Sequence, residues 1–360
     1  MNGEFEKGKV VNNKWVIDSR IGEGCCGIVF KVRDVNDRKR KGAMKVEPKD
    51  EAIQVLKNEA KVMKMLMERK HTVRIIDSGK RANYSYLVMS LLGDSLTKLK
   101  KESPEERFSA SSASRIGVQT LYAIKQLHEV GYVHRDVKPS NLVIGRHGKE
   151  ARMIYLIDYG LARSFVVWEP TGIRIRFARP RALLRGTTRY CSPAVHDRQE
   201  QGRKDDLWSM MYLMLELHVG LPWVHKPEDE TKKMKTEMQD NVLMANCPPE
   251  WIKMMDHIRQ LKYPDRPDYR LLYDLLILSM TRMKVSFADP YDWETPPAGS
   301  NLPRNARKTV GSVEKTEETI SQETFSVDSK SGRPSGTTSS EEAAYPNTIA
   351  AEFDKNDLHI

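Results

Sequence analysis

The segment Tyr132-Val-His134-Arg135-Asp136-Val-Lys138-Pro-Ser-Asn141, followed later by Asp158-Tyr159-Gly160, decides the fold of this 360-residue chain. Phosphoryl transfer needs a carboxylate that accepts or orients a hydroxyl proton, and oxygen ligands that hold Mg²⁺ against phosphates. Asp136 suits the first role, and Asn141 and Asp158 suit the second. Lys138 can stabilise charge on the transferred group. The alternative is a set of solvated loop residues. It is disfavoured because a glycine-rich loop, a lysine and a glutamate precede these two motifs, in the order that a phosphoryl-transfer enzyme of this kind requires.

A glycine-rich segment lies near the N-terminus. The residues Gly22-Glu23-Gly24-Cys25-Cys26-Gly27 fit the pattern G-x-G-x-x-G, which several nucleotide-binding folds share. The strand-like run from Ile28 to Val32 follows, where a dinucleotide-binding fold would have a helix. Lys45 comes 18 residues after Gly27, on another expected strand. The pattern therefore favours a hairpin that covers phosphates with Lys45 as their cation. An ordinary glycine-rich turn with an exposed lysine remains the alternative.

One helix interrupts the expected strands, from about residue 51 to 69. Its inward face is defined by three- and four-residue spacing of Val55, Leu56, Glu59, Val62, Met63 and Leu66. A carboxylate on an apolar face is costly unless it is paired. We therefore expect Glu59 to pair with Lys45 and to orient it toward phosphates, although a partly exposed Glu59 is the alternative.

The chain divides into two lobes of different character. Short alternating runs over the first ninety residues predict an antiparallel sheet. From residue 111 onward helical patterns dominate, with Ala113–Val130, Lys204–Val219 and Pro249–Leu261 as the clearest, and 271–278 as a buried helix. The expected fold class is α+β, a bilobal fold with a β-rich N-lobe that has one main helix and a mainly helical C-lobe.

The last 65 residues differ in composition from the rest. Residues 296–360 contain 16 Ser/Thr and very few large apolar residues, which is typical of a chain that stays disordered. We expect Tyr291-Asp292-Trp293 to pin the last ordered turn. The predicted organisation is an N-terminal extension (1–13), one domain (14–294, with lobes 14–90 and 91–294) and a disordered tail (295–360). The tail is either a phosphorylation target, of this chain itself among others, or passive.

The charge is unevenly distributed. The formal net charge is +10, and residues 296–360 carry 7 Lys+Arg against 10 Asp+Glu, so residues 1–295 carry +13. A basic body attracts nucleic acid, anionic membranes or acidic and phosphorylated proteins, or simply aids solubility. No helix-turn-helix, zinc-ligand or aromatic RNA-binding signature accompanies the charge, so no specific nucleic-acid partner is expected.

Other features bear on location and redox state. The apolar stretch from Leu207 to Trp223 is interrupted and too short to span a bilayer. The first thirty residues carry charges throughout, which predicts an intracellular protein. Cytoplasm is favoured over nucleus, because the basic run at 38–41 fits an exposed turn. The four cysteines show no metal-ligand spacing, so reduced thiols are expected.

At residues 14–290 the chain resembles a eukaryotic-type protein kinase of the casein kinase 1 superfamily, closest to its tau-tubulin kinase branch. The segments that carry this resemblance are His134-Arg-Asp-Val-Lys-Pro-Ser-Asn141, Asp158-Tyr-Gly-Leu-Ala-Arg163, Arg185-Gly-Thr-Thr-Arg-Tyr190, Asp205-Asp-Leu-Trp-Ser209 and Gly220-Leu-Pro-Trp223. The resemblance implies a serine/threonine protein kinase that uses ATP and Mg²⁺ and acts on protein substrates, with Asp136 as catalytic base. By the same resemblance, Met89 is the gatekeeper, Ser90-Leu91-Leu92 is the hinge, and Ile21, Val29 and Ala43 enclose adenine beside the glycine loop from Gly22 to Ile28.

The chain departs from the family pattern at three places, and those in the glycine loop and at residues 192–194 keep a pseudokinase scaffold open as the alternative function. Tyr159 replaces the usual Phe of the metal motif, and its hydroxyl needs a partner if buried. Ser192-Pro193-Ala194 lacks the glutamate that usually anchors the activation segment. Cys25-Cys26 occupies the tip of the glycine loop. The two cysteines either have a redox role or are incidental.

The segment between Asp158 and Pro193 is rich in arginine. It holds Arg163, Arg174, Arg176, Arg179, Arg181, Arg185 and Arg189 against only Asp158 and Glu169. Guanidinium groups bind phosphate and carboxylate bidentately, so Arg185 and Arg189 are predicted to attract acidic or prephosphorylated substrates. Their alternative role is a solvated loop. Thr187 is expected to help fix Asp136 and Lys138.

Overall fold

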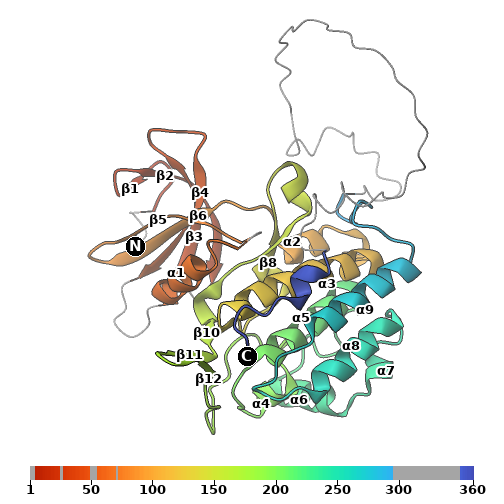
Figure 1. The fold of residues 1–360 in the computed structure, drawn as a ribbon. Coiled ribbons are helices and arrows are strands. Elements are labelled where there is room, and N and C mark those ends of the chain that lie inside the picture. The colour runs from red at the N-terminus through yellow and green to blue at the C-terminus, as the bar shows by residue number, and fades with distance from the viewer. Residues whose placement is uncertain (1–4, 25–26, 49–54, 70–71, 295–348) are drawn as a thin grey trace, which may run out of the picture.

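The structure is a computed structural model that describes residues 5–24, 27–48, 55–69, 72–294 and 349–360. A β-rich N-lobe and a helical C-lobe lie side by side, as Figure 1 shows. The predicted α+β bilobal fold is therefore confirmed.

The N-lobe is an antiparallel sheet with one helix. Its strand order is β1 (Val10–Val11), β2 (Trp15–Gly24), β3 (Gly27–Asp34), β4 (Lys41–Pro48), β6 (Tyr84–Ser90) and β5 (Ile75–Lys80). Apolar side chains from alternate positions fill one core, in which Trp15, Val32 and Met44 are fully buried. Helix α1 (Val55–Met65) buries Glu59 with its apolar face, as its spacing predicts.

The described part of the N-terminal extension, which the sequence sets apart at residues 1–13, packs into the N-lobe. Strand β1 pairs with β2, and Val11 is buried. Phe5 stacks on Phe30 with ring centroids 5.4 Å apart. A two-residue strand carries no alternation, so sequence patterning did not reveal it.

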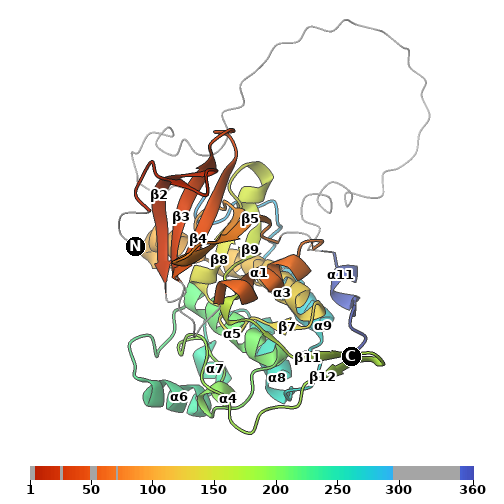
Figure 2. The ribbon, with the colours of Figure 1, turned by 90° about the vertical axis from the view of Figure 1, so that its left-hand side faces the viewer.

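Most of the C-lobe is helical. Its helices are α2 (Leu96–Lys101), α3 (Ala110–Glu129), α4 (Pro193–His196), α5 (Arg203–His218), α6 (Glu228–Glu237), α7 (Asp240–Leu243), α8 (Pro249–Gln260), α9 (Tyr269–Arg282) and α11 (Ala351–Asp354). Short 3₁₀ turns span Pro104–Glu106, Pro139–Asn141, Gly148–Arg152 and Tyr159–Leu161. Helices α3 and α5 are buried along almost their whole length and form the core with α8 and α9 (Figure 2).

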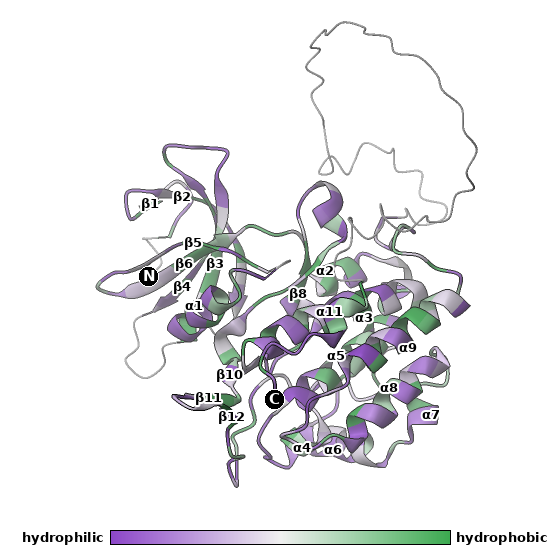
Figure 3. Ribbon diagram, in the orientation of Figure 1, coloured by the Kyte–Doolittle hydropathy of each residue, from purple (hydrophilic) through white to green (hydrophobic). Residues whose placement is uncertain are grey.

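Besides the N-lobe sheet, the described residues form three two-stranded antiparallel pairs. Strand β7 (Tyr132–Val133) pairs with β10 (Arg163–Ser164), β8 (Leu142–Ile144) with β9 (Ile154–Leu156), and β11 (Val166–Glu169) with β12 (Gly172–Ile175). Hydrophobic and hydrophilic stretches alternate along the C-lobe helices in Figure 3, as expected for helices that cover a common core.

The expected disordered tail is wrong for its last part. Tyr291 and Trp293 are buried and stack at 4.3 Å, close to the predicted end of the folded body. Residues 349–360 then form α11, in which Phe353 is buried, and a short turn-containing segment, in which Leu358 is buried. Two isolated apolar residues in a polar tail give no periodic signal, which is why the sequence did not reveal this packing.

Within the described ranges, no helix combines the length and the apolar character that crossing a bilayer requires. Cys191 and Cys247 are free thiols, and burial raises their pKa values to about 11 and about 12, so both stay protonated at neutral pH. Cys25 and Cys26 lie outside the described residues.

Candidate active site

The loop that carries Asp136 begins directly after β7. Arg135 adopts φ +69°, a left-handed conformation that non-glycine residues rarely take. The buried carboxylate of Asp206, on α5, accepts hydrogen bonds from the backbone N–H groups of His134 (2.7 Å) and Arg135 (2.8 Å) and from His128 Nε2 (2.9 Å). Burial opposes ionisation of Asp206, but these hydrogen bonds outweigh it and lower its pKa. Asp206 thus holds the strained turn in place.

The Asp136 carboxylate is held from three sides. Its Oδ1 accepts from Thr187 Oγ1 at 2.8 Å, and its Oδ2 lies 2.6 Å from Lys138 Nζ. Lys138 also donates to Thr187 Oγ1 at 3.0 Å, so the three side chains form a closed triangle. Asn141 Nδ2 donates to the Asp136 carbonyl (2.9 Å) and to Oδ2 (3.3 Å). The predicted role of Thr187 in fixing Asp136 and Lys138 is matched by this geometry.

The activation segment passes very close to this loop at Gly186. A Cβ at Gly186 would lie 2.1 Å from the Arg135 carbonyl oxygen and 3.5 Å from Asp136 Oδ1. The residue also has φ +96°, so two independent constraints require glycine. This approach places Thr187 next to Asp136.

Asn141 and Asp158 lie at the same end of a strand pair. Asn141 precedes β8 and Asp158 follows β9, and Leu142 is paired with Leu156. Because both donors of the Asn141 amide point to Asp136, its oxygen is the atom that remains for a cation. The amide oxygen and the carboxylate are hard ligands of the type that divalent cations prefer beside phosphates, so the residues fit a metal–nucleotide group.

Lys45 connects the two lobes. Its ammonium donates to Glu59 Oε2 (2.7 Å) and to Asp158 Oδ1 (2.8 Å). Burial alone would lower the pKa of Lys45, but the two carboxylates outweigh it and raise the pKa above its usual value. Lys45 lowers the pKa of Asp158 in turn, against the effect of burial. The Lys45–Glu59 pair that the sequence predicted is therefore present, with both side chains almost fully buried.

Helix α1 is also fastened to the metal motif by Asn58. Its Nδ2 donates to the Ala162 carbonyl at 2.9 Å and lies 3.3 Å from the Gly160 carbonyl oxygen. Tyr159, buried at 4% exposure, donates its hydroxyl to the Leu156 carbonyl at 2.8 Å. The partner that the Tyr159 hydroxyl needs thus comes from β9, and the departure from Phe is accommodated.

The glycine-rich segment forms the β2–β3 hairpin. Its register pairs Gly22 with Val29, Glu23 with Ile28, and Gly24 with Gly27. Gly27 has φ +119°, and a Cβ there would lie 2.2 Å from the Val46 carbonyl oxygen. A hairpin, rather than a loop leading into a helix, agrees with the phosphate-covering interpretation.

The residues expected around adenine come from four neighbouring places in the N-lobe. Ile21 is half exposed on β2, and Val29 lies on β3. Ala43 of β4 is directly paired with Met89 of β6, and Leu91 follows the end of β6. The sheet order β2-β3-β4-β6 places these strands next to one another.

The activation segment is anchored without the usual glutamate. Ser192 caps α4 and donates to Asp205 Oδ1 at 2.5 Å. Lys235 of α6 is buried and donates to the carbonyls of Thr188 and Cys191, both at 2.7 Å. Tyr190 donates to Glu216 Oε2 at 2.5 Å. Contacts from α5 and α6 therefore replace the missing anchor.

The seven arginines have different environments. Arg163 and Arg179 pair with Glu200, Arg174 with Glu169, and Arg189 with Glu216 at 3.5 Å. Arg189 also donates to the Val224 carbonyl. Across the described ranges, Arg176, Arg181 and Arg185 have no acidic partner. The structure thus separates the two predicted anion ligands: Arg185 is exposed, whereas Arg189 is engaged.

Sequence reasoning missed Asp206, Asn58 and Lys235. Each acts through contacts with residues far away in the chain, which no local spacing reveals. The only signal for Lys235 was a lysine on the buried face of a polar helix.

The fold and this site define a protein kinase, and comparisons with known proteins agree. Residues 15–281 match the protein kinase domain family. A putative serine/threonine-protein kinase of Caenorhabditis elegans is 40% identical over 81% of this chain and 84% of its own length. A putative casein kinase I of the same organism is 35% identical, covering 80% and 85%. An inactive tau-tubulin kinase of that organism is 35% identical, covering 62% and 81%.

The chain therefore belongs to the protein kinase family and, within it, to the casein kinase 1 superfamily near its tau-tubulin kinase branch. A protein kinase domain uses ATP with a divalent cation to phosphorylate proteins.

Proposed function

We propose that this chain is an active serine/threonine kinase that uses Mg²⁺ with ATP and prefers acidic or already phosphorylated protein substrates. The observation that carries activity is the Asp136 carboxylate, held by Thr187 and Lys138 beside a formed Lys45–Glu59 pair. One relative above is named a serine/threonine-protein kinase and another a casein kinase I, which supports this specificity, whereas a third is named inactive.

The chain's own residues have separable tasks in the reaction. Bound MgATP supplies the transferable phosphoryl group and the cation that neutralises its charge. Asp136 orients the substrate hydroxyl and accepts its proton at the carboxylate. Lys138 neutralises negative charge that develops beside Asp136. Asn141 and Asp158 would hold the cation, and Lys45 would contact the phosphates while Glu59 fixes its position.

The substrate preference rests on an arginine-rich hollow beside the catalytic loop. The hollow, ≈ 570 Å³ in volume, is lined by Arg181, Ala182, Leu183, Leu184, Arg185 and Arg198. Arg198 binds Glu228 through Nη2, and its Nη1 is buried without a partner among the described residues. Three guanidinium groups with spare donors favour a phosphate or carboxylate ligand. These contacts support Arg185 more strongly than Arg189.

The test compares phosphorylation of one peptide in primed and unprimed forms. For wild type we expect a higher kcat/KM on the primed peptide. In Arg185→Ala with Arg189→Ala this ratio should fall about tenfold, because a charge-assisted hydrogen bond contributes about 1.5–3 kcal/mol. Arg107→Ala, which changes an exposed arginine elsewhere, is the matched control. An unchanged ratio contradicts the preference, whereas absence of transfer to both peptides contradicts the activity itself.

A further inference from the structure

The last described segment of the chain occupies a surface of the C-lobe outside the active site. Residues 349–360 comprise α11 and the short segment after it, which contains a turn at residues 357–358. Figure 1 shows α11, coloured blue, lying against α3 and α9, and the end of the chain beside β11. Figure 2 gives the same arrangement from the side. The family match ends at residue 281, before this segment.

An aromatic pocket receives Phe353. Its ring stacks on Tyr273 of α9, with centroids 4.5 Å apart and planes at 22°, and meets the edge of Tyr122 of α3 at 6.0 Å. Phe353 is 1% exposed. Offset stacked and edge-to-face pairs are favourable aromatic geometries, and undocking would expose all three rings to water.

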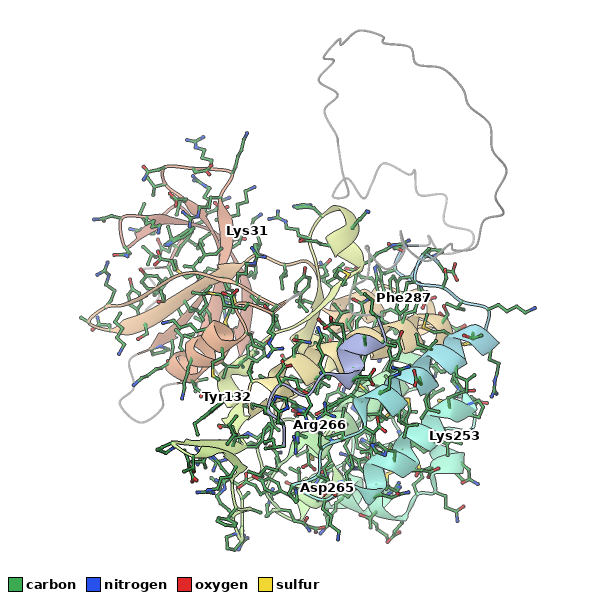
Figure 4. The ribbon with its side chains drawn as sticks, in the orientation of Figure 1. Lys31, Tyr132, Lys253, Asp265, Arg266 and Phe287 are labelled. Atoms are coloured by element: carbon green, nitrogen blue, oxygen red, sulfur yellow. The ribbon has the colours of Figure 1, made fainter. Side chains whose placement is uncertain are left out.

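Complementary charge surrounds this anchor. Asp354 pairs with Arg270 at 2.8 Å, and Asp357 pairs with Arg69. Arg266 donates to the Lys355 carbonyl at 2.7 Å, and Figure 4 shows Arg266 beside this segment. Acidic side chains of the segment thus meet basic side chains of the domain, which fixes orientation more than it adds affinity.

A buried carboxylate of the domain accepts a hydrogen bond from the backbone of the segment. Glu129, at the end of α3, is 5% exposed and accepts from the Asp357 backbone N–H at 2.6 Å. Its other oxygen lies 3.1 Å from Arg266 and 3.3 Å from Lys125. A buried carboxylate that accepts from this backbone N–H fixes the position of the segment at the turn after α11.

The far end of the segment reaches the chain that leads into the catalytic loop and the activation segment. Leu358 packs in a small cluster with Val133, Phe165 and Val166. Val133 directly precedes His134, and Phe165 follows the metal motif by a few residues. Arg69, in turn, follows α1, which carries Glu59. The segment therefore contacts the surroundings of the site from both lobes.

We propose that residues 349–360 form a docking motif that binds this rear groove within its own chain, and that docking holds α1 and the start of the activation segment in the active arrangement. The rear groove is formed by Arg69, Tyr122, Glu129, Arg266, Arg270 and Tyr273. Its ligand class is an acidic peptide with two apolar anchors five residues apart, as in Phe353 and Leu358. Because motif and groove belong to one chain, docking is independent of protein concentration.

Hydrogen exchange of the full chain tests docking without reference to catalysis. In wild type we expect protected amides in residues 353–358, with the same rates at low and high protein concentration. In Phe353→Ala with Leu358→Ala, exchange should accelerate about tenfold or more there and in residues 162–168, and the melting temperature should fall by about 3–6 °C. Lys355→Ala is the control, since only its backbone carbonyl contacts the domain.

A charge exchange separates docking from general damage. Asp357→Arg alone should mimic the double alanine variant, and Asp357→Arg with Arg69→Asp should restore protection. The phosphotransfer rate should fall about fivefold in the undocked variants and recover in the exchanged pair. Unprotected 353–358 amides in wild type, protection that depends on protein concentration, or failure of the paired exchange to restore it would overturn the proposal. An unchanged phosphotransfer rate in the undocked variants would overturn its regulatory part.

Discussion

Replacement of Asp206 by Asn tests how the catalytic loop is held. The two oxygens of Asp206 accept three hydrogen bonds, from the backbone of His134 and Arg135 and from His128. The amide of Asn has only one oxygen acceptor, and its NH₂ group replaces the other oxygen. At least one of the N–H groups that donate to Asp206 would therefore face the amide NH₂ group and lose its acceptor. An unpaired buried donor costs about 1–3 kcal/mol, and loss of the charged acceptor weakens the remaining bonds. The free energy of unfolding should therefore fall by about 3–5 kcal/mol.

The same change should impair catalysis beyond its effect on stability. Arg135 keeps its φ of +69° only while its N–H is held, and relaxation would displace the neighbouring Asp136. A displacement of about 1 Å lowers kcat about 10²-fold. Urea unfolding gives the stability, and steady-state rates well below the melting temperature give kcat. Asp256→Asn, the same change on an exposed position of α8, is the control. A stability loss below about 1 kcal/mol, or an unchanged kcat, would refute this reasoning.

Three further predictions follow from single contacts. Tyr159→Phe removes one buried hydrogen bond and should lower the free energy of unfolding by about 1 kcal/mol with kcat unchanged within about twofold; a large loss of kcat would contradict it. Lys235→Met removes both donors to the activation segment and should lower peptide kcat/KM about tenfold with an unchanged KM for ATP, whereas Lys233→Met should have no effect. Burial lowers the pKa of His196 to about 4, so the unfolded chain binds a proton first, and the free energy of unfolding should fall between pH 6.5 and pH 4, less steeply in His196→Gln. Denaturant titrations at a series of pH values give the free energy of unfolding of each protein. The same slope of this free energy against pH in both proteins would contradict the assignment.

The parts of the site that the sequence predicted are those set by local spacing. Asp136, Lys138 and Asn141 share one loop, and strand register fixes Asn141 beside Asp158. The Lys45–Glu59 pair was predictable across a longer distance because an unpaired carboxylate on an apolar helix face is costly.

The parts that the sequence missed depend on tertiary contacts. Asp206, Asn58 and Lys235 are polar residues whose partners lie far along the chain, and a single sequence does not identify such partners. Arg189 depends on a tertiary contact too, because it lies 3.5 Å from Glu216, a partner that composition does not reveal. Residues 349–360 bury two apolar side chains, Phe353 and Leu358, whose spacing matches neither a helical nor a strand period. The intracellular location stays a prediction.

Phosphate transfer from labelled MgATP to casein, compared between wild type and Asp136→Asn, tests the central claim most directly. Asp136→Asn keeps the shape of the side chain but removes the carboxylate that accepts the hydroxyl proton. We predict transfer by wild type and loss of about 10²-fold or more in the variant, with ATP binding retained by both. Folded wild-type protein that binds ATP without transferring phosphate, or equal transfer by the variant, would contradict the assignment and favour a scaffold.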